Sequence, residues 1–134
     1  MVKVKIYDSK NEQDFVELAA RLYQQCGFQD EKMNTDALIG SSYFGIAYLD
    51  DKPVGVGRVI SDKVHHSLIV DLNIRKEFRG KGCGKSLVIA LARKAKTRNV
   101  ILATDPMNPT LPEFYRKAGF EKLGDSHLFR WPSS

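Results

Sequence analysis

The chain has 134 residues, 43% of them hydrophobic and 28% charged, and its 21 Lys and Arg against 16 Asp and Glu give a formal net charge of +5. This length suits a single compact domain over residues 1–134. No segment is long and apolar enough for a signal peptide or a membrane span, so we expect a cytoplasmic protein without a membrane partner. The two cysteines, Cys26 and Cys83, lack the spacing of a disulfide scaffold or a zinc site and are expected to be free thiols.

The first part of the chain predicts one strand and two helices. Alternation of apolar residues with lysines over residues 2–6 indicates a strand with one solvated face. Ser9 and Glu12 have the spacing of a capping box. The apolar residues that follow recur at helical spacing as far as Gly27, which can end a helix. A weaker helical pattern covers residues 30–39.

Three strands are expected next. Residues 43–49 and 54–60 are rich in β-forming residues and are joined by the turn-forming residues 50–53, so they should pair as a hairpin. A further strand over residues 67–74 follows a second turn. Regular alternation in this strand would place Ile69 on one face and the following residues on the other: Leu68, Val70, Leu72 and Ile74.

A glycine-rich segment follows this strand. Residues 79–85 read RGKGCGK and lead into an amphipathic helix that ends near residue 96, before a short apolar strand at residues 100–104. Glycines at a helix N-terminus free backbone N–H groups for an anion. Residues 75–98 also concentrate cations, with Glu77 the only acid among them. The segment is therefore predicted to bind phosphate.

The remaining residues predict a helix and a hairpin. Thr110 and Glu113 have capping-box spacing, Gly119 can end the helix that they begin, and residues 128–131 suit the last strand. The predicted order is β-α-α-β-β-β-α-β-α-β-β in one mixed α/β domain. The strand, loop, helix and strand around the glycines imply one parallel pair in a sheet that is otherwise largely antiparallel.

Several phosphate-binding patterns can be compared with the glycine segment. A nucleotide-binding P-loop ends as Gly84, Lys85 and Ser86 do, but Arg79 stands where its first glycine belongs. The dinucleotide fingerprint fails at Lys85, which occupies the position of the last glycine. Nucleic acid is disfavoured because the cations of residues 75–98 are interleaved with a single aromatic residue. A glycine-rich turn that only enters a helix remains an alternative.

Two motifs resemble those of a known family. Residues 74–84, IRKEFRGKGCG, resemble motif A of the GNAT superfamily of acyl-CoA N-acyltransferases, whose core is Arg or Gln, two residues, Gly, one residue, then Gly or Ala. Asn108, followed seven residues later by Tyr115 in the segment FYRKAGF, resembles motif B. Lys76 departs from the proline found in many members. The resemblance covers residues 68–120 and implies an N-acetyltransferase fold with a splayed parallel pair of central strands.

The resemblance also implies an activity and a set of site residues. Acetyl-CoA would be the cosubstrate, its pantetheine arm would lie along the strand that includes Leu72, Asn73 and Ile74, and Asn108 would contact this arm or shape its own turn. Tyr115 would protonate the departing thiolate. The pyrophosphate would lie on the loop, where the expected binding residues are Arg79, Gly80, Lys81, Gly82, Cys83, Gly84 and Lys85. No metal is expected.

The general base and the acceptor stay open. Ala103 stands where some members have a glutamate, so Asp71, Asp105 or a water chain could take the proton of the amine. The acceptor could be a small molecule or a protein amine, and a homodimer is compatible with the family. A noncatalytic acyl-CoA-binding or regulatory module is the alternative function. His65 and His66 are expected to be surface residues and Cys83 a packing residue.

Overall fold

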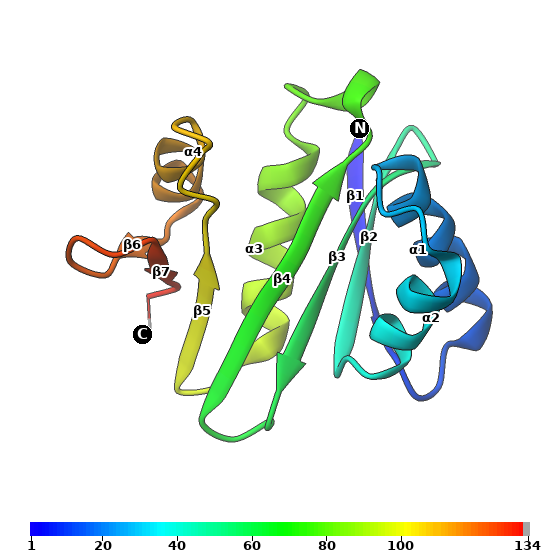
Figure 1. Ribbon diagram of the computed structural model, residues 1–134, viewed down its shortest axis with the longest axis horizontal. Helices are drawn as coiled ribbons and strands as arrows, with labels where there is room; N and C mark the ends of the chain where they lie inside the picture. Colours follow the sequence, from blue (N-terminus) through cyan, green and yellow to red (C-terminus); the bar gives the residue numbers. More distant parts are fainter. Residues whose placement is uncertain (133–134) are drawn as a thin grey trace.

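The computed structural model describes residues 1–132 as one seven-stranded sheet in the order β1-β2-β3-β4-β5-β7-β6 (Figure 1). All neighbouring strands pair antiparallel except β4 and β5, which are parallel. The order of strands and helices is the predicted one, so the predicted fold class is confirmed. The strands are β1 (Val2–Asp8), β2 (Tyr43–Leu49), β3 (Lys52–Ser61), β4 (His66–Ile74), β5 (Asn99–Ala103), β6 (Glu121–Lys122) and β7 (Leu128–Arg130).

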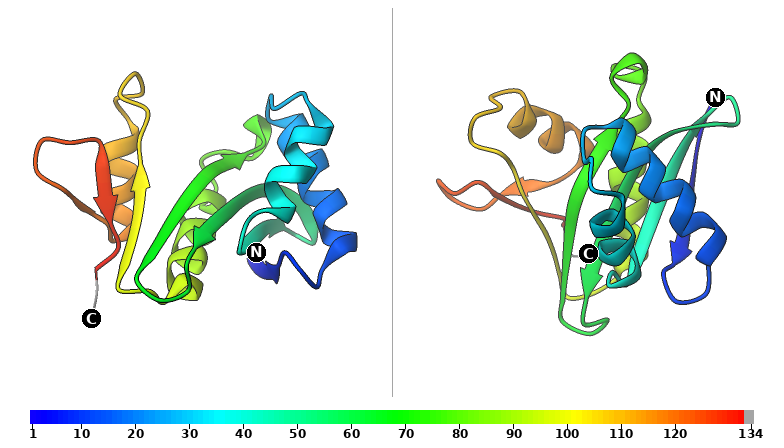
Figure 2. Two further views of the ribbon diagram at one scale, coloured as in Figure 1. Left: turned by 60° about the horizontal axis from the view of Figure 1, so that its bottom comes forward. Right: turned by 45° about the vertical axis from the view of Figure 1, so that its right-hand side comes forward.

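Helices cover both faces of the sheet, but not evenly (Figures 1 and 2). The helix α3 (Cys83–Ala95) packs on one face against β1 to β4, and its residues Leu87, Val88 and Leu91 are fully buried there. On the other face, α1 (Gln13–Gln25) and α2 (Glu31–Ile39) form a second core with β1, β2 and β3. The helix α4 (Leu111–Ala118) lies beside β5, and a short 3-10 helix spans Lys76–Phe78.

The helix ends differ in part from the prediction. Ser9 does not cap α1: the helix begins after Glu12 without a side-chain cap, and the buried Ser9 hydroxyl has no hydrogen-bond partner in the part of the chain that the structure describes. Thr110 does not cap α4 either, because its own N–H and hydroxyl donate to Oδ1 of Asn108. Both predicted capping boxes are therefore wrong. Gly119 ends α4 with a φ of 107°, as predicted, because glycine alone adopts this conformation without strain.

A β-bulge in β4 changes which side chains share a face. Arg58 of β3 pairs with Val70, and Val56 pairs with Asn73, so Gly57 lies opposite two residues of β4, Asp71 and Leu72. Asp71 has a φ of 54°. The extra residue resets the alternation, so residues 72 and 74 join the α3 face while residues 68 and 70 stay on the opposite face. The predicted face shared by residues 68, 70, 72 and 74 is wrong for this reason.

The parallel pair of β4 and β5 is short. Its only paired residues in the part of the chain that the structure describes are residues 66–68 with residues 99–101. Beyond Leu68 the two strands diverge, as Figure 1 shows. The β5-facing edge of β4 at residues 72–74 therefore has no strand partner within residues 1–132, whereas the opposite edge still pairs with β3.

Candidate active site

A cavity of about 320 Å³ opens where β4 and β5 diverge. Three elements contribute its walls: the middle of β4, the end of β5, and the helix α4 that follows β5. The divergence of the strands thus brings residues more than 40 positions apart into one site. The lining residues are Leu68, Ile69, Val70, Asp71, Leu72, Leu102, Ala103, Leu111 and Tyr115.

Tyr115 reaches this cavity from α4. Its side chain is only 7% exposed, and its ring contacts those of Phe114, Phe120 and Phe129 at centroid distances of 5.0, 5.8 and 5.9 Å. Burial raises the pKa of the Tyr115 hydroxyl above its usual value. A hydroxyl with a raised pKa stays protonated at neutral pH, so Tyr115 can donate a proton to a group in the cavity.

The glycine segment forms a loop with free backbone donors at the start of α3. Gly80 and Gly82 have φ values of 79° and 85°, and a Cβ atom at either position would meet no atom of the described residues within 4 Å. Within residues 1–132, none of the main-chain N–H groups of residues 80–85 has a main-chain acceptor. Open space, free N–H groups and a helix N-terminus are the features that bind a phosphate.

The basic side chains of the loop divide into two kinds. Lys81 and Lys85 are exposed and form no ion pair within the described residues. Arg79 instead donates from Nε to the carbonyl oxygen of Ile74 at 3.1 Å, so its side chain braces the loop against the end of β4. The two lysines are therefore open to an anion, whereas the Nε of Arg79 is engaged with the end of β4.

Cys83 and Gly84 lie on the inner side of the loop. Cys83 is 1% exposed, and burial raises the pKa of its thiol, so it is a packing residue rather than a nucleophile. A Cβ at Gly84 would lie 3.3 Å from Cζ of Phe114 on α4, which explains why a glycine suits the contact between α3 and α4. This contact couples the loop to the helix that holds Tyr115.

Asn73 and Asn108 occupy different environments. Asn73 of β4 pairs with Val56 of β3, on the segment of β4 whose other edge has no strand partner within residues 1–132. Asn108 is exposed, and its Oδ1 accepts hydrogen bonds from the N–H and the hydroxyl of Thr110 at 3.1 and 2.7 Å. Asn108 thus shapes the entry to α4, and its contact with a ligand stays a prediction.

The structure distinguishes the two aspartates that are candidate general bases by their position relative to the cavity. Asp71 lines the cavity, whereas Asp105 does not line it and accepts the N–H of Met107 in an exposed turn. Asp71 is held by Arg58, whose Nη2 and Nε donate to Oδ2 at 2.8 and 3.2 Å. Arg58 belongs to no sequence motif, because its contact with Asp71 depends on the pairing of β3 with β4 at the bulge. Nearby on α1, burial and the charge of Asp71 raise the pKa of Tyr23, whose buried hydroxyl has no hydrogen-bond partner among the described residues.

Metal and membrane features are absent from the described residues. Among residues 1–132, no group of three or more His, Cys, Asp or Glu is arranged to hold a metal ion. The helices seen in this part of the chain are all too short or too polar to cross a membrane. The rings of His65 and His66 lie 6.1 Å apart at the end of β4 remote from the glycine loop.

Comparisons with known proteins agree with the two motifs. Residues 11–120 match the model of the acetyltransferase (GNAT) family. A curated relative, the uncharacterized N-acetyltransferase ycf52 of Pyropia yezoensis, is 32% identical over 76 residues, which are 57% of this chain and 44% of the relative. The histone acetyltransferase TAP1 of Glycine max is 32% identical over 82 residues, 60% of this chain and 36% of that protein. The chain therefore spans less than half the length of these two relatives.

Solved structures share the fold. The GNAT family acetyltransferase SP0256 from Streptococcus pneumoniae TIGR4 is 29% identical with a TM-score of 0.69, and the match covers 90% of this chain and 88% of that one. The PaiA N-acetyltransferase of Thermoplasma acidophilum, solved in complex with coenzyme A, is 15% identical with a TM-score of 0.63 over 99% of both chains. Since the family model matches most of the sequence, and the fold and both motifs agree with it, the chain belongs to the acetyltransferase (GNAT) family.

Proposed function

We propose that this protein is an N-acetyltransferase that moves an acetyl group from acetyl-CoA to a primary amine by direct attack. The observation that carries the proposal is the divergence of β4 and β5. It surrounds one cavity with an unpaired strand edge, a protonated Tyr115 and the carboxylate of Asp71. The phosphate-binding loop lies at the end of the same strand.

The residues present fit coenzyme A. The pyrophosphate would bind the free N–H groups of residues 80–85, with Lys81 and Lys85 as exposed cations nearby. The pantetheine arm would pair with the open edge of β4 at residues 72–74, as an added strand does. When bound, acetyl-CoA supplies the activated thioester. A structural neighbour solved with coenzyme A supports this assignment.

The protein groups at the cavity account for each proton and charge in the transfer. A main-chain N–H on the open edge of β4 stabilises the oxyanion that forms when the amine attacks the carbonyl carbon. Asp71 accepts the proton that the ammonium must lose, and Arg58 holds this carboxylate in place. The C–N bond forms, the C–S bond breaks, and Tyr115 donates a proton to the departing thiolate sulfur. The second proton that the amine nitrogen loses when the tetrahedral intermediate collapses returns to Tyr115, so its hydroxyl is restored.

An amine panel tests this proposal. Wild-type protein is incubated with acetyl-CoA and chemically diverse primary amines, while free thiol is measured and the acetylated amine is identified by mass. We expect thiol release that depends on the amine, with equal amounts of acetylated product. Tight binding of acetyl-CoA in calorimetry, without turnover across the panel, would contradict transfer and favour a noncatalytic acyl-CoA-binding module.

A further inference from the structure

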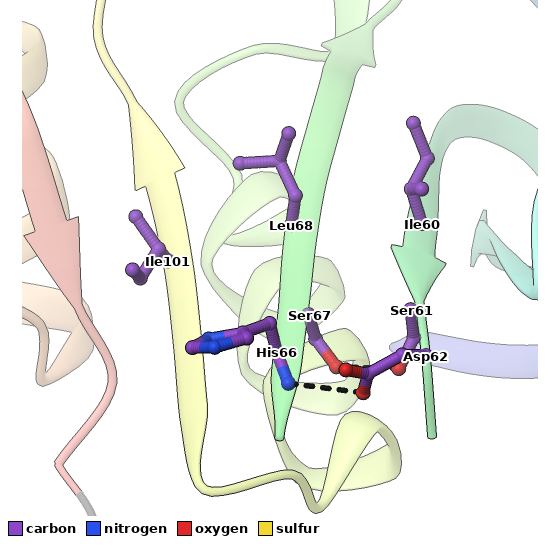
Figure 3. A pocket seen from close by; sticks show the side chains of 7 residues that line it. All are labelled: Ile60, Ser61, Asp62, His66, Ser67, Leu68 and Ile101. Carbon is purple, nitrogen blue, oxygen red and sulfur yellow. Dashed lines mark hydrogen bonds between the residues drawn. The ribbon is translucent and has the colours of Figure 1, made fainter. Parts of the chain in front are cut away.

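The transfer cavity continues into a second cavity along the same face of the sheet. This second cavity, of about 430 Å³, shares Leu68 with the first and is walled by Ile60 of β3 and Ile101 of β5. Ile60 pairs with Leu68, and Leu68 pairs with Ile101, so the three side chains form one row across three strands (Figure 3). We name Ile60, Leu68 and Ile101 the apolar row.

The apolar row is uncovered in the described structure. Ile60 is 45% exposed and Leu68 is 39% exposed, although both lie in the middle of a sheet. The helices α1 and α2 pack over other parts of this face, and α3 packs on the opposite face. Contiguous exposed apolar side chains that adjoin a reaction cavity are typical of a ligand-binding surface.

A third cavity, of about 390 Å³, lies beyond the apolar row and shares His66 with the second cavity. It is lined by hydrogen-bond donors: His65, His66, Arg98, Asn99 and Arg130. His66 and Asn99 precede Leu68 and Ile101 by two residues, so they share the face of the apolar row. Arg130 pairs with Ile101 and therefore lies on this face as well. In Figure 3 the ring of His66 is turned toward β5.

The charges around this third cavity favour an anion. Within residues 1–132, the Nε of Arg130 is buried without a hydrogen-bond partner, and the carboxylate of Glu121 is 3.9 Å from the Nη2 of this arginine. Asp62 is the acid beside His66. Its Oδ1 accepts the N–H groups of residues 64–66, and these bonds, that of His66 first, lower its pKa to about 2, so Asp62 keeps its negative charge; it does not line the third cavity, whose two cations are Arg98 and Arg130. Among residues 1–132, the two arginines of this pocket therefore have no carboxylate partner closer than 3.9 Å.

We propose that the acceptor is a small molecule with three parts: a primary amine, an apolar middle and an anionic group at the far end. The proposal rests on the transfer function. The amine would lie at Asp71, the middle along the apolar row, and a carboxylate or phosphate among His66, Arg98 and Arg130. From Asp71 to His66 the strand advances five residues, so the amine and the anion would be about 16 Å apart.

A matched set of acceptors tests this substrate class. Dodecylamine has only the amine and the apolar chain, aminododecanoic acid and aminododecyl phosphate add an anion at the far end, and diaminododecane adds a cation instead. We expect kcat/KM for at least one anionic compound to exceed that for diaminododecane by about tenfold or more. The anionic group would form charged hydrogen bonds with the arginines of the third cavity, whereas the second ammonium of diaminododecane would be repelled by them. The better of the two anionic compounds shows whether the anionic group of the acceptor is a carboxylate or a phosphate.

Equal kcat/KM values for all four compounds, or a preference for the diamine, would overturn the inference while leaving the transfer function standing. Failure to acetylate any amine would contradict the transfer function itself.

Substitutions of the arginines in the third cavity test whether they cause the preference for an anionic acceptor. Arg130→Gln and Arg98→Gln should each raise KM for the preferred anionic acceptor by about tenfold, with kcat and the kcat/KM for dodecylamine unchanged within about twofold. Arg130→Lys should recover part of the loss because it retains the charge. Arg21→Gln, which removes the same charge from an exposed position on α1, is the matched control. If Arg98→Gln and Arg130→Gln behave as Arg21→Gln does, the anion site is wrong. Arg98 is exposed, so its variant keeps the test valid even if Arg130→Gln impairs folding.

Discussion

The ion pair between Arg58 and Asp71 should stabilise the fold as well as hold the bulge of β4. Two guanidinium nitrogens of Arg58 donate to Asp71 Oδ2, and a third donates to the hydroxyl of Ser41 at 3.2 Å. The Arg58 side chain is 16% exposed and that of Asp71 is 35% exposed. Two charge-assisted bonds contribute about 3 kcal/mol together when shielded, and the partial exposure of Asp71 reduces the expected coupling to about 1.5 kcal/mol.

A double-mutant cycle measures this coupling from urea unfolding of wild type, Arg58→Met, Asp71→Asn and the double variant. Asparagine tolerates the positive φ at position 71, so the substitution removes the charge and leaves the backbone unstrained. Each single change should cost about 2 kcal/mol, or roughly 6–10 °C in Tm for a chain of this size. The double variant should be less destabilised than the sum by about 1.5 kcal/mol. The exposed pair of Lys32 and Asp36 is the control and should show no measurable coupling. If the pair at the bulge behaves like this control, it does not hold the bulge as described.

Three further predictions follow from the loop, the cavity and the core. Gly82→Ala should raise the dissociation constant for acetyl-CoA about fivefold in calorimetry, because an L-residue at a φ of 85° costs about 1 kcal/mol and pushes the loop out of its shape. Gly124→Ala, also at positive φ in open space, should leave this affinity unchanged. Because burial raises the pKa of Tyr115 above about 10, its acid form persists as pH rises, so kcat should not fall between pH 7 and about 9.5; a decline with a midpoint below about pH 9 would exclude this donor. Leu91→Ala removes a fully buried side chain of α3 and should lower the free energy of unfolding by about 2–5 kcal/mol in urea titrations, whereas a loss under about 1 kcal/mol would contradict the described core.

The order of elements could be predicted because local patterns determine it. Alternation at residues 2–6, helical spacing after residue 12 and the turn at residues 50–53 each specify an element within a few residues. The bulge could not be predicted in this way. Aspartate is disfavoured in strands and tolerates a positive φ, but a single aspartate does not specify a bulge, and the φ of 54° at Asp71 accompanies the pairing of β4 with β3. The assignment of side chains to faces therefore failed beyond this residue.

The residues of the candidate site also fall into two groups: those that lie in a contiguous sequence motif and those that strand pairing alone brings to the site. Tyr115 and the loop residues belong to short contiguous motifs, so the resemblance of these motifs to those of the GNAT family named them as candidates. Arg58 and Arg130 belong to no motif and meet their partners only through strand pairing, across 13 residues in the pair of Arg58 with Asp71. Asn108 shows the limit of local patterns, because it, and not the predicted Thr110, supplies the acceptor at the start of α4.

Single-turnover transfer by the Tyr115→Phe variant tests the central claim most directly. Enzyme in excess is mixed with labelled acetyl-CoA and a saturating acceptor, and the rate of label transfer is compared with that of wild type, with the affinity for acetyl-CoA measured separately. Loss of a proton donor at the thiolate should slow the transfer by about 100-fold and leave the affinity unchanged, since the ring and its aromatic contacts remain. A variant that transfers acetyl at the wild-type rate would show that the hydroxyl of Tyr115 plays no part in the reaction.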